Sequence, residues 1–165
     1  MKYSSIGIDP GVNGGIALIT PEYKWYAERF PRDRNPKKAY ALFENMIMNA
    51  KNEGFLIRVF LEKVHAMPHD GRSSLFKFGS NYGLWIGIAV QYPITFVTPK
   101  KWQSHYGDLP KDKKERKNKL KELAIETVGL QLKPTLCTSD AILIAKYGKE
   151  SPDGDSIQWN NKNWG

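Results

Sequence analysis

Three carboxylates stand where apolar segments end or begin, and they are the side chains best placed for chemistry. Asp9 follows a strand-like alternation of isoleucines, and the proline and glycine after it end that strand. Glu62 lies near the end of the apolar run Leu56–Val64, and Asp140 precedes a third apolar run. Asp9 alone would fit an ordinary turn. An ionisable group in a buried strand is costly unless it is paired or metal-bound, so together the three acids favour function.

The chemistry that these acids predict is metal-dependent hydrolysis. Clustered carboxylates repel one another unless divalent cations bind, and hard oxygen ligands select Mg²⁺ or Mn²⁺. A basic protein with such a site suggests phosphodiester cleavage by two ions, which lie about 4 Å apart in known two-metal sites. One ion activates water and the other stabilises the leaving 3′ oxygen.

The elements that must position the acids follow from hydrophobic periodicity. The strand that ends at Asp9 is the first of three strands in a predicted meander. Two later apolar runs are also predicted to be strands. The predicted strands after the first are Gly15–Thr20, Tyr23–Phe30, Leu56–Val64 and Ile94–Val97. The predicted helices run from Pro36 to Gly54, over Leu75–Gln91, through the basic segment to Val128, and from near Pro134 to Gly148. If the first and fourth strands are parallel neighbours, Asp9 and Glu62 lie side by side and the last helix brings Asp140 to face them.

Composition narrows the class of protein. The 165 residues are expected to form one domain over residues 1–150, followed by a loosely ordered tail over 151–165. A net charge of +8 predicts an anionic partner, most commonly nucleic acid. No apolar run has transmembrane length and no signal pattern is present, so neither a membrane nor a secreted location is expected. The lone Cys137 fits a reducing cytoplasm.

Basic residues gather in one segment. Residues 111–121 carry seven lysines and arginines against Asp112 and Glu115. Such runs are usually solvated helix faces. Here the run begins a helix and follows Lys100, Lys101 and Trp102, a combination that favours contact with a phosphate backbone.

At these residues the sequence resembles the RuvC family of Holliday-junction resolvases, within the RNase H-like fold. The matching motifs are I-G-I-D-P-G at 6–11, L-E-K-V-H-A-M-P at 61–68, V-T-P-K-K-W at 97–102 and S-D-A-I-L-I-A-K-Y-G at 139–148. The block S-S-L-F-K-F-G-S-N-Y-G at 73–83 is most similar to the bacteriophage branch, which would place the protein in a host cytoplasm. The resemblance implies an α/β fold with a five-stranded mixed sheet, order 3-2-1-4-5, flanked by helices.

The resemblance also implies roles. Asp9, Glu62 and Asp140 would be catalytic acids that bind two Mg²⁺ or Mn²⁺ ions, with branched DNA as the substrate and no small-molecule substrate. A homodimer is implied, and the glycine-rich helix Leu75–Gln91 is the candidate interface. The expected DNA-binding residues are His65, Met67, Arg72, Phe76, Lys100, Lys101, Lys113, Lys114 and Lys117.

One position departs from the family pattern. The family places a fourth acid or a histidine one helical turn before the last aspartate, and this position holds Cys137, a poor ligand for Mg²⁺. Either three acids suffice, or the position has been altered, or another residue completes the site. His65, His69 and Asp70 are the alternatives, and Cys137 itself stays a candidate metal ligand.

Three other functions remain to be separated from junction cleavage. Another RNase H-like nuclease, acting on RNA–DNA hybrids or flaps, needs the same acids. A catalytically weak junction-binding protein is consistent with the cysteine. An ATP-binding domain of the actin type also carries a G-x-D-x-G strand end, but that architecture needs two domains and far more than 165 residues.

Overall fold

The computed structural model describes residues 3–51, 55–63 and 71–151, and a five-stranded mixed sheet forms its centre. The strand order is β3-β2-β1-β4-β5. The first three strands form an antiparallel meander, whereas β4 is parallel to both β1 and β5. This confirms the predicted fold and strand order. The strands are β1 (Tyr3–Asp9), β2 (Gly15–Ile19), β3 (Trp25–Arg29), β4 (Leu56–Glu62) and β5 (Ile94–Val97).

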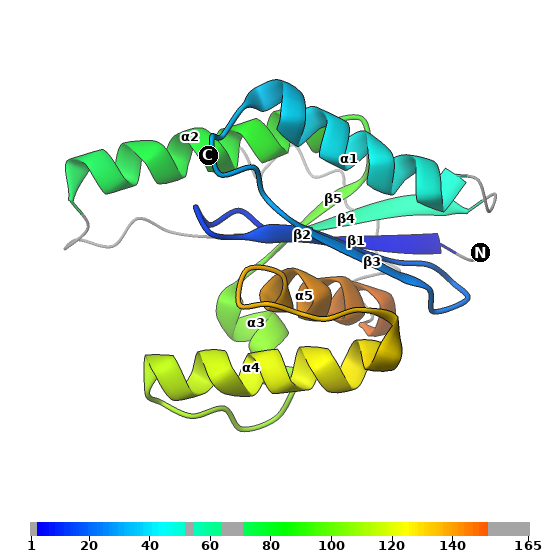
Figure 1. The fold of residues 1–165 in the computed structure, drawn as a ribbon, viewed down its shortest axis with the longest axis vertical. Coiled ribbons are helices and arrows are strands. Elements are labelled where there is room, and N and C mark those ends of the chain that lie inside the picture. Colours follow the sequence, from blue (N-terminus) through cyan, green and yellow to red (C-terminus); the bar gives the residue numbers. More distant parts are fainter. Residues whose placement is uncertain (1–2, 52–54, 64–70, 152–165) are drawn as a thin grey trace.

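Helices cover both faces of the sheet and make a three-layer molecule (Figure 1). Helices α1 and α2 lie on one face, and α3, α4 and α5 lie on the other. A short 3₁₀ turn, η1 (Gly129–Gln131), follows α4. The α-helices are α1 (Pro36–Lys51), α2 (Arg72–Ala89), α3 (Pro99–Ser104), α4 (Lys113–Val128) and α5 (Ser139–Glu150).

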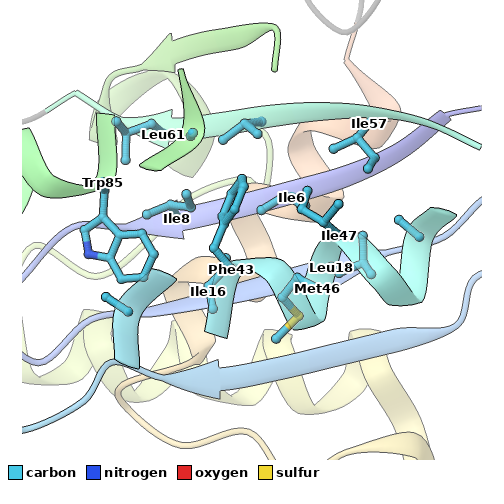
Figure 2. Close-up of a cluster of buried hydrophobic side chains, with 14 of the residues drawn as sticks. Ile6, Ile8, Ile16, Leu18, Phe43, Met46, Ile47, Ile57, Leu61 and Trp85 are labelled. Atoms are coloured by element: carbon cyan, nitrogen blue, oxygen red, sulfur yellow. The ribbon is translucent and has the colours of Figure 1, made fainter. Parts of the chain in front are cut away.

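Apolar side chains from both layers fill the space between the sheet and α1. Ile6 and Ile8 of β1 project toward this face, and Phe43 of α1 packs among them (Figure 2). Trp85 of α2 closes one end of the cluster and stacks on Phe30, with ring centroids 4.0 Å apart. Because side chains alternate along a strand, Gly7 and Asp9 of β1 must face the opposite layer, where α5 lies.

Helix α5 packs against the strands at unusually short range because glycines occupy the contact, in the strands and in the helix itself. A Cβ added at Gly7 would overlap the carbonyl oxygen of Ala141 and the amide nitrogen of Ala145. A Cβ at Gly148 would overlap the ring of Phe60, and one at Gly15 would lie 2.6 Å from the Cys137 carbonyl oxygen. The backbone of α5 therefore rests almost directly on the sheet.

Some elements differ from those expected, and several strand and helix ends shift by one or two residues. Helix α3 was not predicted; it forms because Pro99 begins it and the Thr98 side chain caps it by accepting from the Lys101 N–H. Helix α5 begins at Ser139 and not near Pro134, because residues 135–138 form a hydrogen-bonded turn. Helix α2 begins at Arg72, three residues before the expected start. Among the described residues, no helix is long and apolar enough to cross a membrane.

Gly7→Ala is expected to lower the free energy of unfolding by about 1–3 kcal/mol, the usual cost of overpacking a core. The added methyl group can be accommodated only if α5 moves away from β1. Urea unfolding measures the loss. Gly71→Ala is the control, because a Cβ there has no heavy atom within 4 Å and its φ of −64° suits alanine. Equal stability of Gly7→Ala and the unchanged protein would contradict the close contact.

Candidate active site

Two of the candidate acids leave the sheet side by side. In the parallel pair of β1 and β4, Ile8 lies opposite Leu61, so Asp9 and Glu62 are the next residues at the same edge. Ile8 and Leu61 both belong to the core beneath α1. The following side chains therefore point to the other face, toward α5, as the hydrophobic pattern predicted.

Helix α5 supplies the third acid. Asp140 lies in its first turn, where the helix dipole favours a negative charge. The contact between Gly7 and the following residues of α5, Ala141 and Ala145, sets this first turn over the end of β1. Three residues that lie far apart in the sequence are thereby brought to one edge of the sheet.

Burial raises the pKa of all three carboxyl groups, and repulsion from other acids adds to this effect for Glu62 and Asp140. Burial, together with the charges of Asp9 and Asp140, raises the pKa of Glu62 to about 8. Burial and the charge of Asp9 raise the pKa of Asp140 to about 6. Burial also raises the pKa of Asp9. The charge of Asp9 thus acts on both Glu62 and Asp140, as expected for acids at one edge of the sheet.

Lys117 of α4 opposes that repulsion. Its positive charge lowers the pKa of Asp9, of Glu62 and of Asp140, so the side chain acts on all three acids electrostatically. Lys113 and Lys114, which the sequence singled out beside it, lie in the exposed first turn of the same helix. The lysine whose charge acts on the acids, Lys117, therefore lies one helical turn after Lys113 and Lys114.

Hydrogen bonds from side chains and backbone hold the loop after β1. The Gly11 N–H donates to Oδ1 of Asp9 at 2.9 Å, which favours the ionised form of that carboxyl group. The side-chain amide of Asn81, buried on α2, donates to the Pro10 carbonyl oxygen at 2.6 Å. Sequence analysis missed Asn81, because its acceptor is a backbone group 71 residues away.

Trp102 holds the second acid. Its indole Nε1–H donates to Oε1 of Glu62 at 2.8 Å, and both side chains are buried. Val97, the last residue of β5, lies opposite Glu62 in the sheet. Helix α3, which carries Trp102, begins two residues after Val97. The sequence motif contained Trp102, but no local pattern connected it with an acid 40 positions earlier.

The donor set matches the chemistry of a hard divalent cation. Three carboxylates supply oxygen ligands of the kind that Mg²⁺ and Mn²⁺ prefer, and their raised pKa values indicate a concentration of negative charge that a cation would neutralise. Within the described residues, no three acidic, histidine or cysteine side chains converge closely enough to hold an ion. The residues thus fit a metal site by type and location, in a more open arrangement than a bound ion requires.

Cys137 does not occupy the position expected for it. The prediction placed it on the same helix as Asp140, one turn earlier, but the chain forms a turn there and α5 begins two residues later. The Cys137 N–H bonds to the Thr135 hydroxyl, and the residue is half-buried. The prediction that Cys137 and Asp140 lie on one face of the same helix is therefore wrong. It gives no reason to count Cys137 among the metal ligands.

The remaining candidate residues divide into three groups. Lys100 and Lys101 lie on α3 and are exposed, on the same side of the sheet as α4. Phe76 projects from the second turn of α2 with 77% of its surface exposed. His65 and Met67, the alternative ligands His69 and Asp70, the side chain of Arg72 and the tail 152–165 lie outside the described residues.

No protein-family model matches the chain, and no curated protein matches it. Solved structures do match it. A structure of T. thermophilus RuvC in complex with Holliday junction substrate aligns with a TM-score of 0.53 and 15% identity, over 87% of this chain and 90% of that one. This chain has a RuvC-like fold. A second Thermus thermophilus RuvC structure aligns with a TM-score of 0.52 and 17% identity, over 87% and 91% of the two chains.

We expect metal-free protein to lose stability as the pH rises from about 5 to 8. Folded Glu62 keeps its proton up to a pKa of about 8, against an ordinary value of 4.5. Between these values the unfolded state binds fewer protons, so the free energy of unfolding falls with pH. Glu62→Gln cannot ionise and keeps an oxygen that accepts from Trp102. At pH 8 it should be more stable than the unchanged protein by on the order of 3 kcal/mol.

Urea unfolding in a chelator, over a series of pH values, measures this difference. It should shrink toward pH 4, below the ordinary pKa of 4.5, where folded and unfolded Glu62 are both largely protonated. Glu126→Gln provides the control, because this glutamate is exposed on α4. A Glu62→Gln protein with the same pH slope as the unchanged protein would contradict the raised pKa.

Proposed function

We propose that this protein is a structure-selective endonuclease that resolves four-way DNA junctions, and other branched DNA, by metal-dependent phosphodiester hydrolysis. The observation that carries the proposal is the meeting of Asp9, Glu62 and Asp140 at one sheet edge beside Lys117. The RuvC-like fold supports it, since one solved structure with this fold holds a Holliday junction.

Asp9, Glu62 and Asp140 would hold the metal ions, Mg²⁺ or Mn²⁺ and two in number. Bound there, the ions would supply activation of water and stabilisation of the leaving oxygen. The protein's own contribution is positional: Gly11 orients Asp9, Trp102 orients Glu62 and the first turn of α5 presents Asp140.

Basic side chains around the acids would bind the DNA backbone. Lys100 and Lys101 on α3, and Lys113 and Lys114 on α4, are exposed where phosphates could approach. Lys117 is placed differently, because its charge reaches the carboxylates themselves. We assign it to the scissile phosphate and the other four lysines to the flanking backbone. His65, Met67 and Arg72 remain part of the proposed DNA-binding surface.

Helix α2 would carry both the dimer interface and a base-stacking residue. A Cβ added at Gly79, Gly83 or Gly87 would have no heavy atom within 4 Å, which leaves room for a second helix. Phe76 extends from the same helix and could stack on bases opened at the exchange point. A two-fold dimer matches the two-fold symmetry of a junction that must be cut in two strands.

The narrower assignments belong to the same proposal. Membership of the bacteriophage branch rests on the motif at 73–83, and location in the cytoplasm rests on the lone cysteine. Residues 1–150 would form the nuclease domain, with 151–165 as a tail. Roles in DNA recombination and repair would follow from junction cleavage.

Cleavage of labelled four-way junctions tests the proposal. Matched linear duplexes, flaps and RNA–DNA hybrids are incubated beside them with Mg²⁺, with Mn²⁺ and with chelator. Paired, symmetric cuts in opposed strands of the junction, dependent on metal, are expected. The mass of the protein–junction complex should correspond to two protein chains. Preferential cleavage of hybrids or flaps, or binding without cleavage, would overturn the proposal in favour of the corresponding alternative.

Asp9→Asn and Asp140→Asn should each lower the junction cleavage rate by roughly 100-fold or more, a loss typical of removing one group that stabilises a transition state. Junction binding should change little, because the basic surface supplies the affinity. Single-turnover cleavage and gel-shift titration measure the two quantities separately. Cleavage at the unchanged rate in either variant would show that the site lies elsewhere.

Lys117→Ala should lower cleavage by about tenfold or more, since it removes a positive charge placed beside the reacting groups. Lys113→Ala makes the same charge change on the same helix and serves as the matched control. Both variants should lose a similar amount of affinity and of salt dependence, but only Lys117→Ala should slow bound-state cleavage. Equal cleavage rates in the two variants would show that Lys117 only binds the DNA backbone, as the other lysines are proposed to do.

A further inference from the structure

The indole ring of Trp102 is fixed by the packing around it. The side chain has 0% of its surface exposed and belongs to the buried cluster between the sheet, α4 and α5. The ring of Tyr106 meets it edge-on, with centroids 6.3 Å apart. The Tyr106 hydroxyl in turn donates to the Leu143 carbonyl oxygen of α5. Trp102 is thus a rigid group and not a mobile surface side chain.

This rigid ring directs its one polar atom at the candidate metal site. Nε1–H donates to Oε1 of Glu62 at 2.8 Å, and Glu62 is 8% exposed. Among the described residues, no group donates to the other carboxylate oxygen, Oε2. One oxygen of Glu62 is therefore held by the protein, and the second remains open to another ligand.

We propose that Trp102 is a positioning residue, which holds Oε1 of Glu62 so that Oε2 is presented to a divalent cation bound between the three acids. The inference rests on the proposed function in one respect, namely that the ligand of the three acids is a divalent cation. Hydrogen bonds to a ligating carboxylate fix its orientation, and loss of such a partner typically weakens metal binding by about 10–100-fold.

Trp85 shows that packing alone does not require such a bond. It is also a fully buried tryptophan, but its Nε1 has no hydrogen-bond partner within the described part of the chain. Its ring stacks on Phe30 on the opposite face of the sheet. The two tryptophans are matched in burial and differ in whether the indole N–H is used.

The test replaces the N–H and keeps the shape. Benzothienylalanine, in which sulfur takes the place of the indole nitrogen, is incorporated at position 102 and, as the control, at position 85. Mn²⁺ binding to each protein is followed by the electron paramagnetic resonance of the free ion, without DNA. The position-102 variant should bind Mn²⁺ about tenfold more weakly or worse, and the position-85 variant should bind as the unchanged protein does.

A second measurement reads the hydrogen bond directly. In ¹⁵N-labelled protein the indole N–H resonance of Trp102, assigned with Trp102→Phe, should shift on addition of Mg²⁺ and on Glu62→Gln, whereas that of Trp85 should not. Unchanged Mn²⁺ affinity at position 102, equal losses at both positions, or no Mn²⁺ binding by the unchanged protein would overturn the inference. Trp102-dependent Mn²⁺ binding without junction cleavage would support it and refute the proposed function instead.

Discussion

The close approach of α5 to the sheet is the contact on which the candidate site depends. Gly7 of β1 leaves room for the backbone of α5, Gly15 of β2 leaves room for the Cys137 carbonyl just before that helix, and Gly148 of α5 leaves room for the Phe60 ring of β4. A helix packed at ordinary distance through larger side chains would hold Asp140 further from the strand ends that carry Asp9 and Glu62. Productive metal and catalytic geometry tolerates displacements of only about 0.5 Å. The glycines therefore matter through the space they leave and not through backbone flexibility.

The placement of three acids at one edge of the sheet lowers the stability of the fold. Three carboxyl groups with raised pKa values favour their protonated forms, so ionising them at neutral pH costs folding free energy. The fold offsets part of the cost with a backbone N–H on Asp9, an indole N–H on Glu62 and the charge of Lys117. A core optimised for stability alone would not keep three acids in this place. The residual repulsion is what a divalent cation would relieve.

Sequence periodicity was sufficient to place the five strands and the ends of β1 and β4 where Asp9 and Glu62 lie, because strand alternation and buried runs are local signals, while the strand order followed from the family resemblance. Periodicity was insufficient for contacts made across the fold. The link between Trp102 and Glu62 spans 40 residues and that between Asn81 and Pro10 spans 71, so no spacing rule could indicate either. Helix α3 has only six residues, too few for a periodic signal. Pro134 suggested an early start of α5, but the hydroxyls of Thr135 and Thr138 close a turn there first.

Helix α2 joins the two ends of the proposed mechanism. Its inward face carries Asn81, which holds the loop that follows Asp9, and its outward face carries the open glycine positions. The side-chain amide of Asn81 donates to the carbonyl oxygens of Pro10 and Gly11, so α2 supports the backbone that follows Asp9. If two protomers met along the outward glycines, the same helix would carry the partner on one face and this support on the other. The proposed pairing surface and the proposed active site would then depend on the placement of one helix.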